Sequence, residues 1–127
     1  IPQISEGTEF FSQAYTPSTA NCELYIYCSA AVRERTNVAD EVGMALFIND
    51  STDALKVVTG FMQGYGHGEL LHLYHKMPSW GASAKTFSLR SHKANSVNYQ
   101  ALYGGYPSEK FSAAASQTLF IIEEIST

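Results

Sequence analysis

The chain lacks the features that mark nucleic-acid-binding and membrane-spanning proteins. It has 8 Lys and Arg against 12 Asp and Glu, a formal net charge of −4, and no segment that gathers its basic residues. Binding to a phosphate backbone needs such a basic stripe, so we expect no nucleic-acid partner. No apolar run reaches the roughly 18 residues of a spanning helix, and the start shows no basic-then-apolar signal pattern. We therefore expect no membrane insertion.

Cysteine is scarce, with Cys22 and Cys28 as its two occurrences. The segment between them alternates apolar and polar residues, which predicts a strand and separates the two by roughly 20 Å. Because a disulfide needs Cα atoms within about 7 Å, they cannot pair with each other. Both share the face of Leu24 and Ile26. We expect two reduced, buried thiols, which favours assembly in a cytoplasm.

Motifs for catalysis and cofactor binding are also missing. The glycine-rich segment 64–68 lacks the Gly-Lys-Ser/Thr ending of a phosphate loop. Glu123 and Glu124 are adjacent, so on a strand they face opposite ways and cannot flank one substrate bond. No serine lies in a nucleophile-elbow motif. We expect a non-enzyme without a cofactor, and a small carbohydrate-active enzyme is the less favoured alternative.

Three histidines close together in sequence raise the question of a metal site: His67, His72 and His75. On a strand, His72 and His75 point to opposite faces, and no His-x-His pair is present. We therefore expect no metal site within one chain. In a trimer, one axial histidine per chain would bring three imidazoles together. Metal analysis of the purified protein tests that alternative.

Aromatic residues and short alternating segments are abundant. The chain has 8 Tyr, 7 Phe and one Trp, and 45% of its 127 residues are hydrophobic, which is enough for one domain to bury a core. Turn residues recur at short intervals, with almost no helical periodicity. The expected strands are around Phe10, Cys22–Ala31, Val42–Ile48, Leu55–Met62, Glu69–Met77, Phe87–Leu89, Val97–Tyr103 and Leu119–Ile125. About eight strands at this spacing predict an all-β, antiparallel β-sandwich.

The whole chain, residues 1–127, is predicted to form one domain, because it contains no linker and no internal repeat. Residues 1–20 mix Pro2, Gly7 and a Thr-Pro-Ser turn with a short apolar strand, which is typical of a lead-in segment. The chain starts at Ile1 without a methionine. We expect a fragment of a longer protein, in which the lead-in segment follows an absent shaft.

Several segments resemble a known family in their pattern and order. They are Thr16-Pro17-Ser18 before Cys22–Ala31, then Val42–Asp50, then Pro78–Ser83 before Thr86–Arg90, and finally Thr118–Ile125. In this order they resemble the C-terminal head domains of bacteriophage tail fibres and receptor-binding proteins. These heads are jelly rolls similar to tumour necrosis factor and complement globular heads. The likeness covers most of the chain from residue 8 onward, except residues 64–76.

The resemblance implies a viral adhesion head at a fibre tip, in a virion assembled in the host cytoplasm. Such a head is a homotrimer around a three-fold axis and is joined to the remainder of the fibre on its N-terminal side. It recognises a host-surface receptor, a glycan or a protein. The alternative is a structural trimerisation knob or cap of the fibre without a ligand of its own.

Aromatic residues in loops are the candidate ligand-binding residues. Tyr65, Trp80, Tyr103 and Tyr106 lie in or beside segments with Gly or Pro, where a core role is less forced than on a strand. Their rings have polar tips, which suits stacking on sugars and hydrogen bonding to hydroxyls. The alternative is that they cap the ends of the sandwich.

Two polar residues complete the candidate site. His67 lies in the glycine-rich loop with Tyr65, and Arg90 lies on the strand near Phe87. The alternative for Arg90 is ordinary solvation. Because loops carry function on rigid scaffolds, we expect a glycan-binding surface at one end of the sandwich, shared between neighbouring subunits.

The last expected strand is apolar on both faces. Leu119, Ile121 and Ile125 alternate with Phe120 and Ile122. This pattern is typical of a strand in the middle of an inner sheet, with one side on the core and the other on a partner. It predicts oligomerisation independently of the resemblance.

Overall fold

Seven strands account for most of the residues that the computed structural model describes, which are 1–33, 40–62, 68–93 and 118–127. The strands are β1 Thr8–Tyr15, β2 Cys22–Arg33, β3 Asp40–Ile48, β4 Lys56–Met62, β5 Gly68–Pro78, β6 Lys85–Lys93 and β7 Leu119–Ser126. Within these ranges, no helix has the length and hydropathy needed to cross a membrane.

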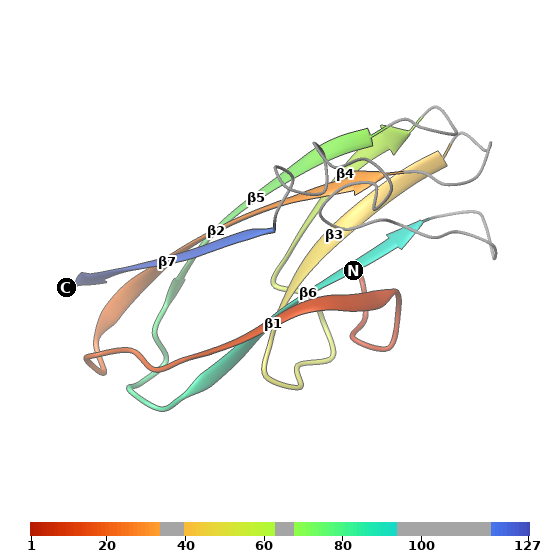
Figure 1. Cartoon of the computed structure of the whole chain (residues 1–127). Coiled ribbons are helices and arrows are strands. Elements are labelled where there is room, and N and C mark those ends of the chain that lie inside the picture. Colours follow the sequence, from red (N-terminus) through yellow and green to blue (C-terminus); the bar gives the residue numbers. More distant parts are fainter. Residues whose placement is uncertain (34–39, 63–67, 94–117) are drawn as a thin grey trace.

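The strands form two antiparallel sheets that face each other (Figure 1). One sheet has the order β1-β6-β3-β4 and the other β5-β2-β7. The predicted all-β, antiparallel sandwich is confirmed. The expected strand Val97–Tyr103 lies outside the described residues. A count of eight strands and the jelly-roll connection therefore stay predictions.

Strict alternation puts one face of each strand into a shared core. In β2, Leu24, Ile26 and Cys28 are fully buried, whereas Tyr25 and Tyr27 between them face outward and are half-buried. Residues from β5 in the same sheet and from β3 and β6 in the facing sheet complete this core: Leu71, Leu73, Met77, Val42, Met44, Leu46, Phe87 and Leu89. Burying each such side chain stabilises the fold by about 1.5–3 kcal/mol, so this layer is what holds the sheets together.

The two cysteines lie in this core as free thiols, as predicted. Burial raises the pKa of Cys28 to about 12, because a thiolate would lose its hydration there. The thiol therefore stays protonated at neutral pH and behaves as a small apolar side chain.

The sheets are tied together at one edge, between β1 and β7. The Phe120 ring of β7 stacks on Phe11 of β1 at 5.0 Å between centroids and lies 6.1 Å from Phe87. These inward contacts confirm that one side of the last strand packs on the core. Among the described strands β7 pairs with β2 alone and ends the order β5-β2-β7, where the sequence had predicted a central strand.

Glu124 makes a second tie at the same edge. Its carboxylate accepts hydrogen bonds from the Tyr15 hydroxyl at 2.6 Å, from the hydroxyl and backbone N–H of Ser18, and from the Thr19 N–H. The Ser18 hydroxyl, the Tyr15 hydroxyl and the Ser18 N–H lower the pKa of Glu124 to about 2. Glu123 faces the other way, as the alternation predicted. Through its bonds to Ser18 and Thr19, Glu124 anchors the loop between β1 and β2.

Candidate functional site

Trp80 lies in the loop between β5 and β6 with its side chain 59% exposed. Its backbone φ is +51°, a left-handed conformation that bulky residues rarely adopt. Asn49 is the other described non-glycine residue with positive φ, and asparagine tolerates this region far better than tryptophan. A strained backbone persists where its surroundings force it, and such positions cluster at functional sites. The loop therefore holds an exposed ring in a disfavoured conformation.

Buried polar contacts fix this loop on both sides of Trp80. Ser79 donates its N–H to the Cys22 carbonyl and its hydroxyl to the Ala20 carbonyl, each at 2.9 Å. The buried Lys85 ammonium donates to the carbonyls of Gly81 and Ser83, both at 2.9 Å. These bonds satisfy groups that burial would otherwise penalise. The indole is thus presented on a well-anchored turn.

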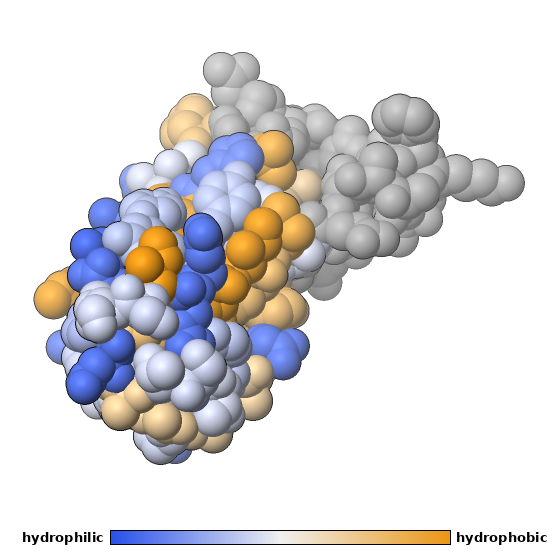
Figure 2. Space-filling view, turned by 90° about the vertical axis from the view of Figure 1, so that its left-hand side faces the viewer, coloured by the Kyte–Doolittle hydropathy of each residue, from blue (hydrophilic) through white to orange (hydrophobic). Residues whose placement is uncertain are grey.

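A shallow hollow of about 410 Å³ lies beside the Trp80 ring. Its lining comes from the start of β2, the end of β5 and the end of β7: Ala20, Asn21, Cys22, Glu23, Pro78, Ser79, Trp80, Gly81 and Thr127. Figure 2 faces the end of the sandwich where the C-terminus lies and shows mostly hydrophilic surface broken by separate apolar patches. An aromatic wall beside amide, hydroxyl and carboxylate groups is suited to an amphipathic ligand.

Glu23 is the charged residue in the lining of this hollow. Its carboxylate lies 2.9 Å from the Lys76 ammonium and accepts a hydrogen bond from the Tyr25 hydroxyl at 3.1 Å. The hydrogen bond from Lys76 is the main cause that lowers the pKa of Glu23, and the Tyr25 hydroxyl contributes. Glu23 is therefore ionised at neutral pH but already has a counter-ion.

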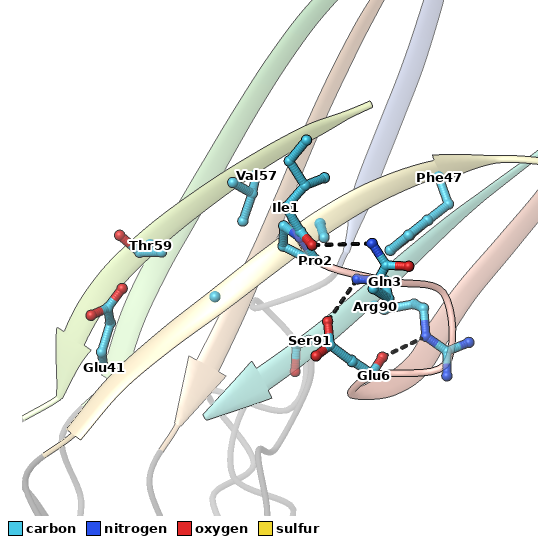
Figure 3. Close-up of a pocket in the computed structure, with 12 residues that line it drawn as sticks. Ile1, Pro2, Gln3, Glu6, Glu41, Phe47, Val57, Thr59, Arg90 and Ser91 are labelled. Carbon is cyan, nitrogen blue, oxygen red and sulfur yellow. Dashed lines mark hydrogen bonds between the residues drawn. The ribbon is translucent and has the colours of Figure 1, made fainter. Parts of the chain in front are cut away.

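Arg90 lies elsewhere, on the outer face of the four-stranded sheet. Its guanidinium donates to the Glu6 carbonyl at 2.9 Å (Figure 3). It also donates to the Gly7 carbonyl at 3.0 Å and lies 3.7 Å from the Glu9 carboxylate. Arg90 thus secures the N-terminal segment, and its donors are engaged there. The hollow that it lines shares no residue with the hollow beside Trp80. The structure does not bring these two candidate residues together.

The hollow near Arg90 measures about 270 Å³ and has an apolar floor. Gly43, Ala45, Phe47 and Val57 form this floor, and residues 1–3 lie over it (Figure 3). At the rim, the Gln3 N–H donates to the Glu6 carboxylate at 2.7 Å. Because the polar groups of the segment bind one another, this hollow has less to offer a hydroxyl-rich ligand than the one beside Trp80.

Four other candidate residues, Tyr65, His67, Tyr103 and Tyr106, lie outside the described residues and stay predictions. His72 and His75 point to opposite sides of β5, as expected, with His72 exposed and His75 half-buried. Among the described side chains, no three of His, Cys, Asp and Glu are grouped so that they could hold a metal ion.

The site residues predicted from the sequence did not include the tyrosines on the outward face of β2 and β5. Tyr27 of β2 pairs with Tyr74 of β5, and Tyr25 pairs with Lys76. The alternation of β2 already places both of its tyrosines opposite the core residues. The alternation of β2 could therefore have indicated that Tyr25 and Tyr27 face outward. Which side chains of β5 lie beside these two tyrosines is known only from the strand register.

Comparison with protein-family models and with curated proteins gave no match for this chain. The resemblance to fibre heads therefore depends on its sequence pattern, and any function has to be argued from the site.

Proposed function

We propose that this chain is the adhesion head of a bacteriophage fibre and binds a host-surface glycan in the hollow beside Trp80. The observation that carries the proposal is the exposed indole, held at positive φ by a turn whose polar groups are anchored in the sandwich. Such an arrangement costs conformational energy and gives the core nothing, so a contact outside the chain is the reason to keep it.

The chemistry of the hollow suits a sugar. The flat indole face stacks on the apolar face of a pyranose ring, while polar groups at its edge reach hydroxyls. Asn21, Glu23 and Thr127 supply such groups around the ring. A hollow this shallow gives modest affinity, and three heads on one fibre would supply avidity by raising the effective concentration.

A homotrimer is the second part of the proposal. Three of the outward side chains of β7, Leu119, Ile121 and Ile125, are between 42% and 47% exposed and form an aliphatic stripe that is interrupted by Glu123. Aliphatic side chains gathered on one strand favour a protein partner, because burial removes them from water. We infer that this stripe packs against neighbouring heads, with the remainder of the fibre joined before the chain, in a virion assembled in the host cytoplasm.

A ligand-free trimerisation knob is the second candidate function. The aliphatic stripe favours it, since the stripe needs a partner and makes no use of a ligand. The Trp80 turn is what separates the two functions, because a knob has no need of an exposed, strained aromatic residue.

Glycan-array screening of the purified protein tests the proposal. We expect reproducible binding that Trp80→Ala abolishes and Phe61→Ala preserves. Phe61 is the matched control, because it is an aromatic residue 56% exposed on β4 of the other sheet. A blank array with an intact trimer would favour the knob, and protease-sensitive binding to host cells would indicate a protein receptor. Turnover of a surface polysaccharide would show an enzyme and contradict the proposal.

A further inference from the structure

The hollow beside Trp80 opens onto the outer face of the three-stranded sheet. Glu23 belongs to both, since it lines the hollow and is the first outward residue of the β2–β5 ladder, where it pairs with Pro78. Further along the same face come Tyr25 beside Lys76 and Tyr27 beside Tyr74. We call Tyr25, Tyr27 and Tyr74 the tyrosine row.

The hollow and the tyrosine row together are too long for a single sugar. From Glu23, which lines the hollow, to Tyr27, the face spans four residues, or about 13 Å at the usual rise of a strand. Tyr74, which pairs with Tyr27 at the far end of this span, is 53% exposed. With Trp80 at one end, the aromatic residues mark a continuous path along the ladder.

The rings of the row are held in position before any ligand arrives. The Tyr25 hydroxyl donates to Glu23, and the Tyr27 hydroxyl shares a hydrogen bond of 2.7 Å with His72 Nδ1. The Tyr25 and Tyr74 rings lie 6.2 Å apart at a tilt of 42°. A pre-ordered surface loses less entropy on binding, which favours a weakly bound ligand such as a carbohydrate.

The charges along this face disfavour an acidic ligand. Lys76 is paired with Glu23 and also lies 5.3 Å above the Tyr25 ring, so its charge is already compensated. On the other side of Tyr25, β7 contributes the exposed carboxylate of Glu123. The described charged groups thus sum to a negative value, which repels sialic or uronic acids and sulfated sugars.

From this continuity and charge we infer that an uncharged polysaccharide segment of several sugar units lies along the tyrosine row, with one end in the hollow beside Trp80. The inference rests on the proposed function, because it extends the same site. Phenol rings with satisfied hydroxyls are suited to stacking on sugars. The neighbouring aliphatic stripe of β7 is better suited to a second copy of the chain.

Fragments of purified bacterial surface polysaccharides, neutral and acidic and graded from one sugar upward, test this inference. We expect neutral fragments to bind more tightly as they lengthen, and acidic fragments of equal length to bind more weakly. Tyr74→Ala should weaken binding of long neutral fragments about tenfold and leave the shortest unchanged. Trp80→Ala should weaken both, and Phe61→Ala neither.

The possible failures are distinct. Short fragments that bind as tightly as long ones, or acidic fragments that bind as tightly as neutral ones, would overturn the inference and leave the proposed function intact. Loss of the trimer in Tyr74→Ala would show that the row contacts a second copy. Absence of binding by every fragment would overturn both the inference and the glycan-binding function.

Discussion

The outer faces of the two sheets occupy equivalent places in the sandwich, but the N-terminal segment covers part of one face and leaves the other exposed. On the four-stranded sheet, Phe47 points outward yet is 1% exposed, in a hollow over which Pro2 and Gln3 lie. On the three-stranded sheet, Tyr74 also points outward and is 53% exposed. An aromatic residue on an outer face is therefore structural where the chain covers it and available for binding where the chain does not.

The charged side chains of the two faces also differ in what they bind. Arg90 on the covered face binds backbone carbonyls of the N-terminal segment, so it holds the cover in place. Lys76 and Glu23 on the open face bind each other, and near them Tyr25 and Tyr27 stay half-buried and Tyr74 exposed. Sequence type alone does not separate these roles, because arginine and lysine are both ordinary surface residues.

The sharpest way to break this comparison is to remove one aromatic side chain from each face. Phe47→Ala should lower the free energy of unfolding by about 3–5 kcal/mol, because it removes the contacts of a buried ring. Tyr74→Ala should lower it far less, by about 1 kcal/mol, since about half of this residue is already in water. Urea unfolding of both variants measures the difference.

Phe61→Ala is the control for that pair, because Phe61 is exposed on the same sheet as Phe47. If its cost is as small as that of Tyr74→Ala, burial explains the large effect at position 47. Equal losses for Phe47→Ala and Tyr74→Ala would show that the two faces do not differ in the way described.

A second comparison sets the aliphatic stripe of β7 against an exposed aliphatic residue of β4. Ile121→Glu should weaken self-association by about a hundredfold or more, because an unpaired carboxylate would be buried between subunits. Val57→Glu, at a residue that is 40% exposed on the covered face, should leave association unchanged. Light scattering over a concentration series checks both. A wild-type protein that is monomeric throughout would contradict the proposed trimer.

Local patterns predicted much of the fold and little of the site. Alternation placed Leu24, Ile26 and Cys28 in the core, because the side-chain period of a strand does not depend on its neighbours. It also separated Glu123 from Glu124 correctly. The order and register of strands are long-range properties, so the neighbours of the tyrosines on β2 were not predictable.

The candidate site residues show the same limit. Arg90 and Trp80 were expected in one site, but Arg90 binds carbonyls more than 80 positions away in the sequence and lies apart from Trp80. Trp80 was a candidate because a loop next to glycine is a local signal, whereas its positive φ and the bond from the buried Lys85 to the Gly81 carbonyl were not predictable. Only features of the candidate site that depend on residues nearby in the sequence were predictable.

The smallest expected effect concerns β7, the strand of the three-stranded sheet that contacts β1 of the four-stranded sheet. β7 exposes its aliphatic stripe on one side, and on the other its Glu124 holds the loop after β1. Because the pKa of Glu124 in the folded protein is about 2, below its ordinary 4.5, the carboxylate is stabilising above pH 4.5. That contribution is lost as the pH falls from 4.5 towards 2. Glu124→Gln should lower stability at neutral pH and flatten the decline in this window.

Glu123→Gln is the matched control, since this neighbouring carboxylate faces outward and is exposed. Urea midpoints measured from pH 6 to pH 2 for the wild type and both variants give the comparison. Glu123→Gln should follow the wild-type decline, while Glu124→Gln should diverge from it above pH 4.5 and converge with it near pH 2. Identical profiles for all three would mean that Glu124 does not tie β7 to the covered sheet. In that case β7 would owe its position to its pairing with β2 and to the packing of Phe120 and Ile122 against the core.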